Sequence, residues 1–146
     1  GRHVAGSDDD FVLRMNILLE RFSLKNSHFT NPHGLGRSSH YASAYDLAIL
    51  SRYGMSLPGF KEIVTAPNWR AQGSRDLSYA NINTFLFNYR GADGIKTGYT
   101  RGAGPTLVAS ATRNGHRLYA VVLNSPSRDL DATRLLNWAF ANYVWP

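Results

Sequence analysis

Asp93-Gly94-Ile95-Lys96-Thr97-Gly98-Tyr99-Thr100 leads into the apolar run Thr106-Leu107-Val108-Ala109-Ser110-Ala111, and a third apolar run follows the pair Asn114-Gly115. An Asn-Gly pair between two apolar runs is a strong signal of a β-hairpin, so these strands should be antiparallel. Apolar residues at helical spacing near the C-terminus predict a helix that covers the sheet. The expected segments are strands over 94–100, 106–112 and 117–123, a Gly-Pro turn at 104–105 and a helix over about 130–144.

The triplet Lys96-Thr97-Gly98 contains residue types that suit a strand edge where a substrate binds. Lys96 supplies a compact positive charge, Thr97 a hydroxyl that can bind a carboxylate, and Gly98 room for a second backbone to approach. A substrate could add to such an edge as an extra strand, paired by main-chain hydrogen bonds. Because side chains alternate faces along a regular strand, Lys96 and Thr97 would reach one cleft only at a twisted edge.

Helices separated by loops are expected over the first two thirds of the chain. Ser7 is an expected N-cap, and apolar residues recur at helical spacing from Phe11 to Phe22. Ser43 with Asp46 resembles a capping box at the start of a second helix, which Gly54 ends. The other expected segments are a loop over 23–40, a short helix over 60–64, an irregular stretch over 67–73 and an apolar run over 85–87.

The chain of 146 residues carries a net charge of +6 and has a pI near 9.9. A basic protein suits an anionic partner such as a cell wall, an acidic membrane surface or nucleic acid. The basic residues are scattered and no nucleic-acid-binding motif is present. An ordinary basic surface is therefore the favoured interpretation, and no nucleic-acid partner is expected. The absence of cysteine excludes disulfides and thiolate chemistry in this chain.

Other polar clusters have simpler interpretations than metal or cofactor binding. His28, His33 and His40 are accompanied by neither the cysteines nor the His-Glu-x-x-His helix of a zinc site. Ser39, His40 and Asp46 are the residue types of a hydrolase triad, but no Gly-x-Ser-x-Gly elbow accompanies them. We therefore expect no metal and no cofactor.

Eight segments of the chain, including Asn31-Pro32-His33-Gly34-Leu35 and Lys96-Thr97-Gly98, follow one another in an order typical of one enzyme family. By these segments the chain resembles the C-terminal portion of the catalytic domain of serine D-alanyl-D-alanine carboxypeptidases. These are the low-molecular-mass penicillin-binding proteins of peptidase family S11. The segments are 4–7, 11–16, 24–29, 31–35, 41–48, 93–100, 107–111 and 135–140.

The resemblance implies an α+β, β-lactamase/transpeptidase-like fold, in which an antiparallel sheet is flanked by helices. It also implies that residues 1–146 are the C-terminal part of a penicillin-binding transpeptidase-like domain whose nucleophile-bearing N-terminal part is absent. In this sequence no serine stands three residues before a lysine, and none stands two residues before an asparagine. The family's Ser-x-x-Lys and Ser-x-Asn elements are thus expected outside the chain, which alone should be inactive.

The activity implied by the resemblance is that of a serine-type D-Ala-D-Ala carboxypeptidase, which removes the terminal D-alanine of a peptidoglycan stem peptide through an acyl-enzyme. In that mapping Lys96 is the catalytic residue. Thr97, Gly98 and Tyr99 bind the substrate, and the Tyr99 amide is one oxyanion-hole donor. The implied partners are the stem peptide, β-lactam antibiotics as inhibitors and the missing N-terminal half of the domain. The alternatives are a D-Ala-D-Ala endopeptidase, a β-lactamase-like relative or a non-catalytic cell-wall-binding remnant.

Two positions depart from the family's pattern. Many relatives have Asn-Arg-Asn where this chain has Asn81-Ile82-Asn83, so a carboxylate-binding arginine is lost, and Pro105 replaces a usual aromatic residue.

The resemblance implies a periplasmic or extracytoplasmic location, with or without attachment to the cytoplasmic membrane. The sequence has no signal peptide and no apolar run that could span a bilayer, and it starts with Gly rather than Met. We therefore expect a processed or excerpted chain.

Overall fold

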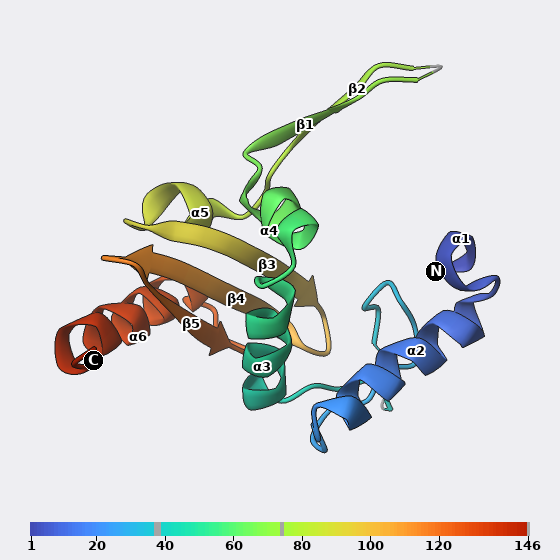
Figure 1. The fold of residues 1–146 in the computed structure, drawn as a ribbon, viewed down its shortest axis with the longest axis horizontal. Coiled ribbons are helices and arrows are strands. Elements are labelled where there is room, and N and C mark those ends of the chain that lie inside the picture. Colours follow the sequence, from blue (N-terminus) through green and yellow to red (C-terminus); the bar gives the residue numbers. More distant parts are fainter. Residues whose placement is uncertain (37–38, 74, 146) are drawn as a thin grey trace.

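The computed structural model describes residues 1–36, 39–73 and 75–145, which form helices and two antiparallel sheets (Figure 1). Positions 37–38, within the predicted loop over 23–40, lie outside the described residues. None of the helices in the described ranges has the length and apolar character needed to cross a membrane. The helices are α1 (Arg2–Ala5), α2 (Asp8–Arg21), α3 (Ala44–Gly54), α4 (Pro58–Thr65), α5 (Thr84–Asn88) and α6 (Arg128–Asn142), and the strands are β1 (Asn68–Ala71), β2 (Leu77–Ala80), β3 (Ala92–Thr100), β4 (Gly104–Arg113) and β5 (His116–Val122).

The central sheet has the strand order β3-β4-β5, and both strand pairs are antiparallel. One face, here called the α6 face, carries Leu107, Ala109 and Ala111 of β4, which are fully buried. They share a core with Leu136 of α6 and Phe85 of α5. On the opposite face, here called the α3/α4 face, α3 contacts β5 and α4 contacts β3 (Figure 1). The core therefore lies mainly between the sheet and α6.

The predicted Asn-Gly hairpin is confirmed between β4 and β5. Asn114 and Gly115 have positive φ angles of 50° and 82°, as a tight turn between twisted strands requires. The predicted Gly-Pro turn is wrong, because Gly104 and Pro105 are the first residues of β4. Pro105 is tolerated because it stands at the end of the ladder, where its carbonyl accepts from the Ser125 N–H at 3.0 Å and faces away from β3.

Two predicted helix starts are confirmed by side-chain caps. The Ser7 hydroxyl accepts from the Asp10 N–H at 3.0 Å, and the Ser43 hydroxyl accepts from the Asp46 N–H at 3.1 Å. The buried Asp46 carboxylate accepts from the Ser27 hydroxyl at 2.8 Å instead of returning to the Ser43 N–H, as a capping box would. The Ser27 hydroxyl accepts from that N–H at 3.1 Å. The start of α3 is therefore tied to the preceding loop.

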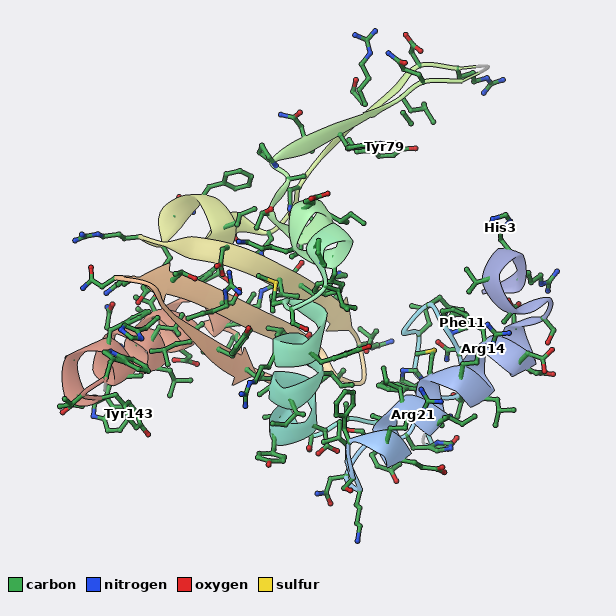
Figure 2. All side chains as sticks on the ribbon, in the orientation of Figure 1. His3, Phe11, Arg14, Arg21, Tyr79 and Tyr143 are labelled. Carbon is green, nitrogen blue, oxygen red and sulfur yellow. The ribbon has the colours of Figure 1, made fainter. Side chains whose placement is uncertain are left out.

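The predicted irregular stretch over 67–73 is wrong, since β1 pairs with β2 in a ribbon that projects from the rest of the molecule (Figure 1). Trp69 and Tyr79 stand opposite each other in this ribbon, and both are exposed. Figure 2 shows the Tyr79 side chain on the projecting ribbon. Each strand has only four residues, too few for a periodic pattern to distinguish a strand from a loop. The predicted apolar run over 85–87 lies in helix α5.

Candidate active site

β3 carries the Lys-Thr-Gly triplet and forms one edge of the central sheet in the described part of the chain. Tyr99 stands opposite Pro105, which has no N–H and whose carbonyl is bound by Ser125. In an antiparallel pair without mutual hydrogen bonds, both residues point their backbone polar groups outward. The N–H and C=O of Tyr99 therefore face the open edge of β3, and by the two-residue period those of Thr97 do as well. The Tyr99 side chain is 71% exposed.

Lys96 and Thr97 lie on opposite faces of the sheet, as the alternation of a regular strand predicts. Thr97 stands opposite Leu107 on the α6 face, and only 6% of its surface is exposed. Lys96 stands opposite Val108 on the α3/α4 face and is exposed. Its ammonium group nevertheless turns to the open edge, because it donates to the Thr97 carbonyl. The structure thus brings the Lys96 charge to the edge and buries most of the Thr97 side chain.

Gly98 lies where a side chain would not fit. A Cβ atom at this position would come within 2.5 Å of the Thr106 hydroxyl on β4. Arg128, at the start of α6, donates from Nη1 to the Gly98 carbonyl at 2.9 Å and to the Thr106 carbonyl at 3.2 Å. Sequence reasoning missed Arg128, because no motif links it to a residue 30 positions earlier. Only the packing of α6 on the sheet brings the two together.

Asp93 lies near the start of β3 and bonds to side chains of both other strands of the sheet. Its carboxylate accepts from the Ser110 hydroxyl at 2.6 Å, the Thr112 hydroxyl at 2.7 Å and the Arg117 Nε at 2.9 Å. Burial disfavours the charged form of Arg117, but hydrogen bonding and the charge of Asp93 outweigh it and raise the pKa of the guanidinium. The result is a partly buried ion pair between β3 and β5, and the two hydroxyl bonds from β4 let Asp93 link all three strands of the sheet.

The triplet Asn81-Ile82-Asn83 connects the ribbon to α5. The Asn81 amide donates to the Ala66 carbonyl at 3.0 Å, which ties this segment to the end of α4. Ile82 is 78% exposed, so the position where the resemblance expects arginine in many relatives carries an apolar side chain at the surface. The amide of Asn83 is buried and has no hydrogen-bond partner among the described residues. Water or a polar group from outside these residues is therefore expected to bind it.

The loop before α3 contains histidines that bind the backbone. His28 Nδ1 pairs with the Ser39 carbonyl at 2.8 Å, and the Thr30 N–H donates to His40 Nδ1 at 3.1 Å. Burial, and after it the charges of His33 and His28, lowers the pKa of His40. Since a protonated nitrogen cannot accept a hydrogen bond, the bond from Thr30 requires that Nδ1 of His40 carry no proton.

Stability is expected to fall as the pH drops below 6.5, the ordinary pKa of histidine. The unfolded chain binds a proton at His40 in this range, whereas the folded protein resists protonation until its lower pKa is reached. The contribution of His40 is therefore complete above the unfolded pKa and is lost as the pH falls through the folded one. Thermal melts of the complete product of the gene that encodes this chain, between about pH 7.5 and 5, measure the effect. In His40→Gln, Tm should fall less steeply as the pH drops. The control His3→Gln replaces an exposed histidine and should leave the slope of Tm against pH unchanged. An unchanged slope in His40→Gln as well would contradict the prediction.

Comparison with known proteins identifies relatives along nearly the whole chain. The family described as D-alanyl-D-alanine carboxypeptidase, peptidase S11, matches residues 1–127. The chain is 39% identical over 147 residues to D-alanyl-D-alanine carboxypeptidase DacA of Haemophilus influenzae, with 97% of this chain and 37% of that protein covered. The chain thus spans little more than a third of the length of this curated relative.

Solved structures show the same fold. The D-alanyl-D-alanine carboxypeptidase of Mycobacterium tuberculosis matches with a TM-score of 0.88 and 31% identity, covering 97% of this chain and 57% of that one. A DD-transpeptidase of Streptomyces matches with a TM-score of 0.87 and 33% identity, covering 90% of this chain and 54% of that one. These matches confirm the predicted α+β fold with an antiparallel sheet flanked by helices. The chain belongs to the D-alanyl-D-alanine carboxypeptidase family.

Proposed function

We propose that this chain supplies half of the active site of a serine-type D-Ala-D-Ala carboxypeptidase, which removes the terminal D-alanine from peptidoglycan stem peptides. The observation that carries the proposal is the open edge of β3, which the Lys96 ammonium and the Tyr99 N–H both face. A peptide that adds to this edge as a strand would meet outward-facing backbone donors and acceptors beside a positive charge. The names of the family and of the relatives support the substrate class.

The nucleophile would come from residues outside this sequence, which has no Ser-x-x-Lys element. In the proposed reaction, the serine oxygen attacks the carbonyl carbon of the penultimate D-alanine, and its proton passes to the leaving amine. The C–N bond breaks, free D-alanine departs, and the serine holds the acyl group as an ester. Water then attacks the ester, its C–O bond to serine breaks, and the serine recovers its proton.

The triplet and the residue after it have separate proposed roles. Lys96, the catalytic residue of this half, stabilises the negative charge that develops during attack and organises the proton network. The Tyr99 N–H is one oxyanion-hole donor, and Gly98 lets the substrate backbone approach closely. Thr97 holds the terminal carboxylate through its hydroxyl. Because only 6% of Thr97 is exposed, this role requires that the hydroxyl be the part of the residue that the substrate reaches.

The proposed partners follow from the same chemistry. A stem peptide is the substrate, and a β-lactam acts as an inhibitor by acylating the same serine. The N-terminal half of the domain, which supplies that serine, completes the site. The reaction takes place in the periplasm or another extracytoplasmic space, where the net charge of +6 suits an anionic cell wall.

Labelling with a fluorescent penicillin tests the proposal, with the complete product of the gene and this chain alone measured side by side. We expect covalent labelling of the complete product only, together with release of D-alanine from a stem pentapeptide. Cleavage of cross-linked peptide dimers in place of this release would identify an endopeptidase. Rapid turnover of the penicillin would identify a β-lactamase-like enzyme. A complete product that is never labelled would contradict the enzyme proposal and favour a non-catalytic cell-wall-binding protein.

Replacement of Arg128 with alanine is expected to slow penicillin labelling of the complete product by about 10- to 100-fold. A hydrogen bond from a charged group contributes about 1.5–3 kcal/mol, and Arg128 holds the Gly98 carbonyl immediately before the Tyr99 amide. The second-order rate constant of labelling measures the effect. Arg134→Ala is the matched control, because it removes an arginine of the same helix whose side chain is 71% exposed. Equal rate constants for the two variants would contradict a role for Arg128.

A further inference from the structure

β3 contains an extra residue that sets the faces of the residues after it. Ala92 pairs with Ala111, but the next pair is Gly94 with Ser110, so the ladder shifts by one residue at Asp93. This is a β-bulge, in which two residues of one strand oppose one residue of its partner. Had the first register continued without the bulge, Asp93 itself would stand opposite Ser110.

The bulge decides which face of the sheet receives the Lys96 side chain. A one-residue shift of register moves every later side chain of a strand to the opposite face. Lys96 now lies on the α3/α4 face and Thr97 on the α6 face, and without the bulge the two would exchange faces. The buried Ile95, opposite Ala109 on the α6 face, favours the observed register, whereas Gly94 and Gly98 have no side chain that could specify it. A second interaction, at the bulge itself, fits the same register.

The hydrogen bonds of the Asp93 carboxylate fit the bulged register. They come from Ser110 and Thr112, two residues apart on β4, and from Arg117 on β5, at 2.6, 2.7 and 2.9 Å. Asp93 reaches both hydroxyls because the bulge places it between them. Directly opposite Ser110, it would have Thr112 as a diagonal neighbour about 7–8 Å away, too far for a short aspartate.

Gly94 fits the same register, because a Cβ atom there would lie 3.2 Å from Val64 of α4 and 3.3 Å from the Ser110 hydroxyl. Without the bulge, Asp93 would bring its side chain to this crowded place. We propose that Asp93 is a positioning residue, which locks β3 in the bulged register and thereby holds Lys96 on the α3/α4 face. This hold of Asp93 on the register, here called the lock, is a property of the sheet alone. The consequence of the lock for catalysis rests on the proposed function.

Cysteine accessibility measures the register directly, because the chain contains no cysteine of its own. Single Lys96→Cys and Thr97→Cys variants of the complete gene product, with any cysteine outside residues 1–146 replaced by serine, are treated with a thiol-specific reagent. Exposed position 96 should react at least about tenfold faster than buried position 97. When Asp93→Ala is added to each cysteine variant, the ratio of the rate at position 96 to the rate at position 97 is expected to fall at least about tenfold.

Asp76→Ala is the matched control, because it removes an exposed carboxylate that also pairs with an arginine, Arg70, at 3.0 Å. The ratio should stay unchanged in this control. An unchanged ratio in a folded Asp93→Ala protein would overturn the lock. Should Asp93→Ala fail to fold, Thr112→Val removes one of the bonds and keeps the side-chain shape. A partial fall in the ratio then supports the lock, and an unchanged ratio overturns it.

A separate measurement connects the lock with the proposed reaction. Asp93→Asn keeps the shape of the side chain but removes the negative charge that faces Arg117. Acylation of the complete product by penicillin should slow about tenfold in this variant, and acylation at the unsubstituted rate would overturn the catalytic consequence. If the unsubstituted protein is never acylated, the proposed function fails, and the cysteine ratio still decides the lock.

Discussion

Replacement of Lys96 with alanine is expected to slow covalent labelling of the complete gene product by penicillin by about 100- to 1000-fold, the loss typical of a missing oxyanion-hole donor. The Lys96 side chain is exposed, and its ammonium group donates to the Thr97 carbonyl at the open edge of β3. Its charge is therefore available at the edge where, in the proposed reaction, negative charge develops on the attacked carbonyl. Because Lys96 lies outside the core, alanine removes this charge and leaves the packing intact. The second-order rate constant of acylation measures the effect.

Two further variants separate the role of Lys96 from a general effect of charge. Lys61→Ala removes another exposed lysine, on α4, and should label at the unsubstituted rate. Lys96→Arg keeps the charge but spreads it over a planar group, so an intermediate rate is expected. If Lys96→Ala and Lys61→Ala label equally fast, the proposed catalytic role of Lys96 is wrong.

Leu136→Ala is expected to lower the free energy of unfolding by about 2–5 kcal/mol. Leu136 is 1% exposed and lies in the core between α6 and the sheet, so alanine leaves a cavity that the surrounding side chains fill only in part. Since whole domains are stable by about 5–15 kcal/mol, this loss is a large share of the total. Denaturant-induced unfolding of the complete product measures it, as a fall in the midpoint at unchanged slope.

The neighbouring Leu135 provides the control for this prediction. Leu135→Ala removes the same atoms from the same helix, but the side chain is 49% exposed and lies outside the core cluster. Its cost should be well below that of Leu136→Ala, because little buried contact is lost. Equal losses for the two variants would show that the core does not lie where the structure places it.

Local patterns were enough to predict several elements of the fold. Asn114-Gly115 marked the hairpin, because positive φ angles at both turn positions are a local requirement. Ser7 and Ser43 marked helix starts, because their hydroxyls bind a backbone N–H only three residues away. The alternation of the Lys-Thr-Gly strand correctly placed Lys96 and Thr97 on opposite faces. In each case the interaction that decides the structure lies within a few residues.

Elements that depend on distant partners were missed. The β1–β2 ribbon rests on pairs such as Trp69 with Tyr79, and its short exposed strands leave no periodic signal. Pro105 suggested a turn, but the pairing of β4 with β3 and the contact with Ser125 extend the strand through it. The contact of Arg128 with the Gly98 carbonyl exists only because α6 packs on the sheet.

The sequence alone determined the turns, the helix starts and the strand that carries Lys96, Thr97, Gly98 and Tyr99, since these follow from local backbone preferences and side-chain periodicity. Its ordered motifs also determined the family. The tertiary structure decided which backbone groups stay open at the edge of β3 and which face receives Lys96. That face depends on a bulge whose extra residue, Asp93, bonds to side chains of two other strands. Local sequence patterns do not predict hydrogen bonds between residues far apart in the chain, so only the folded sheet reveals them.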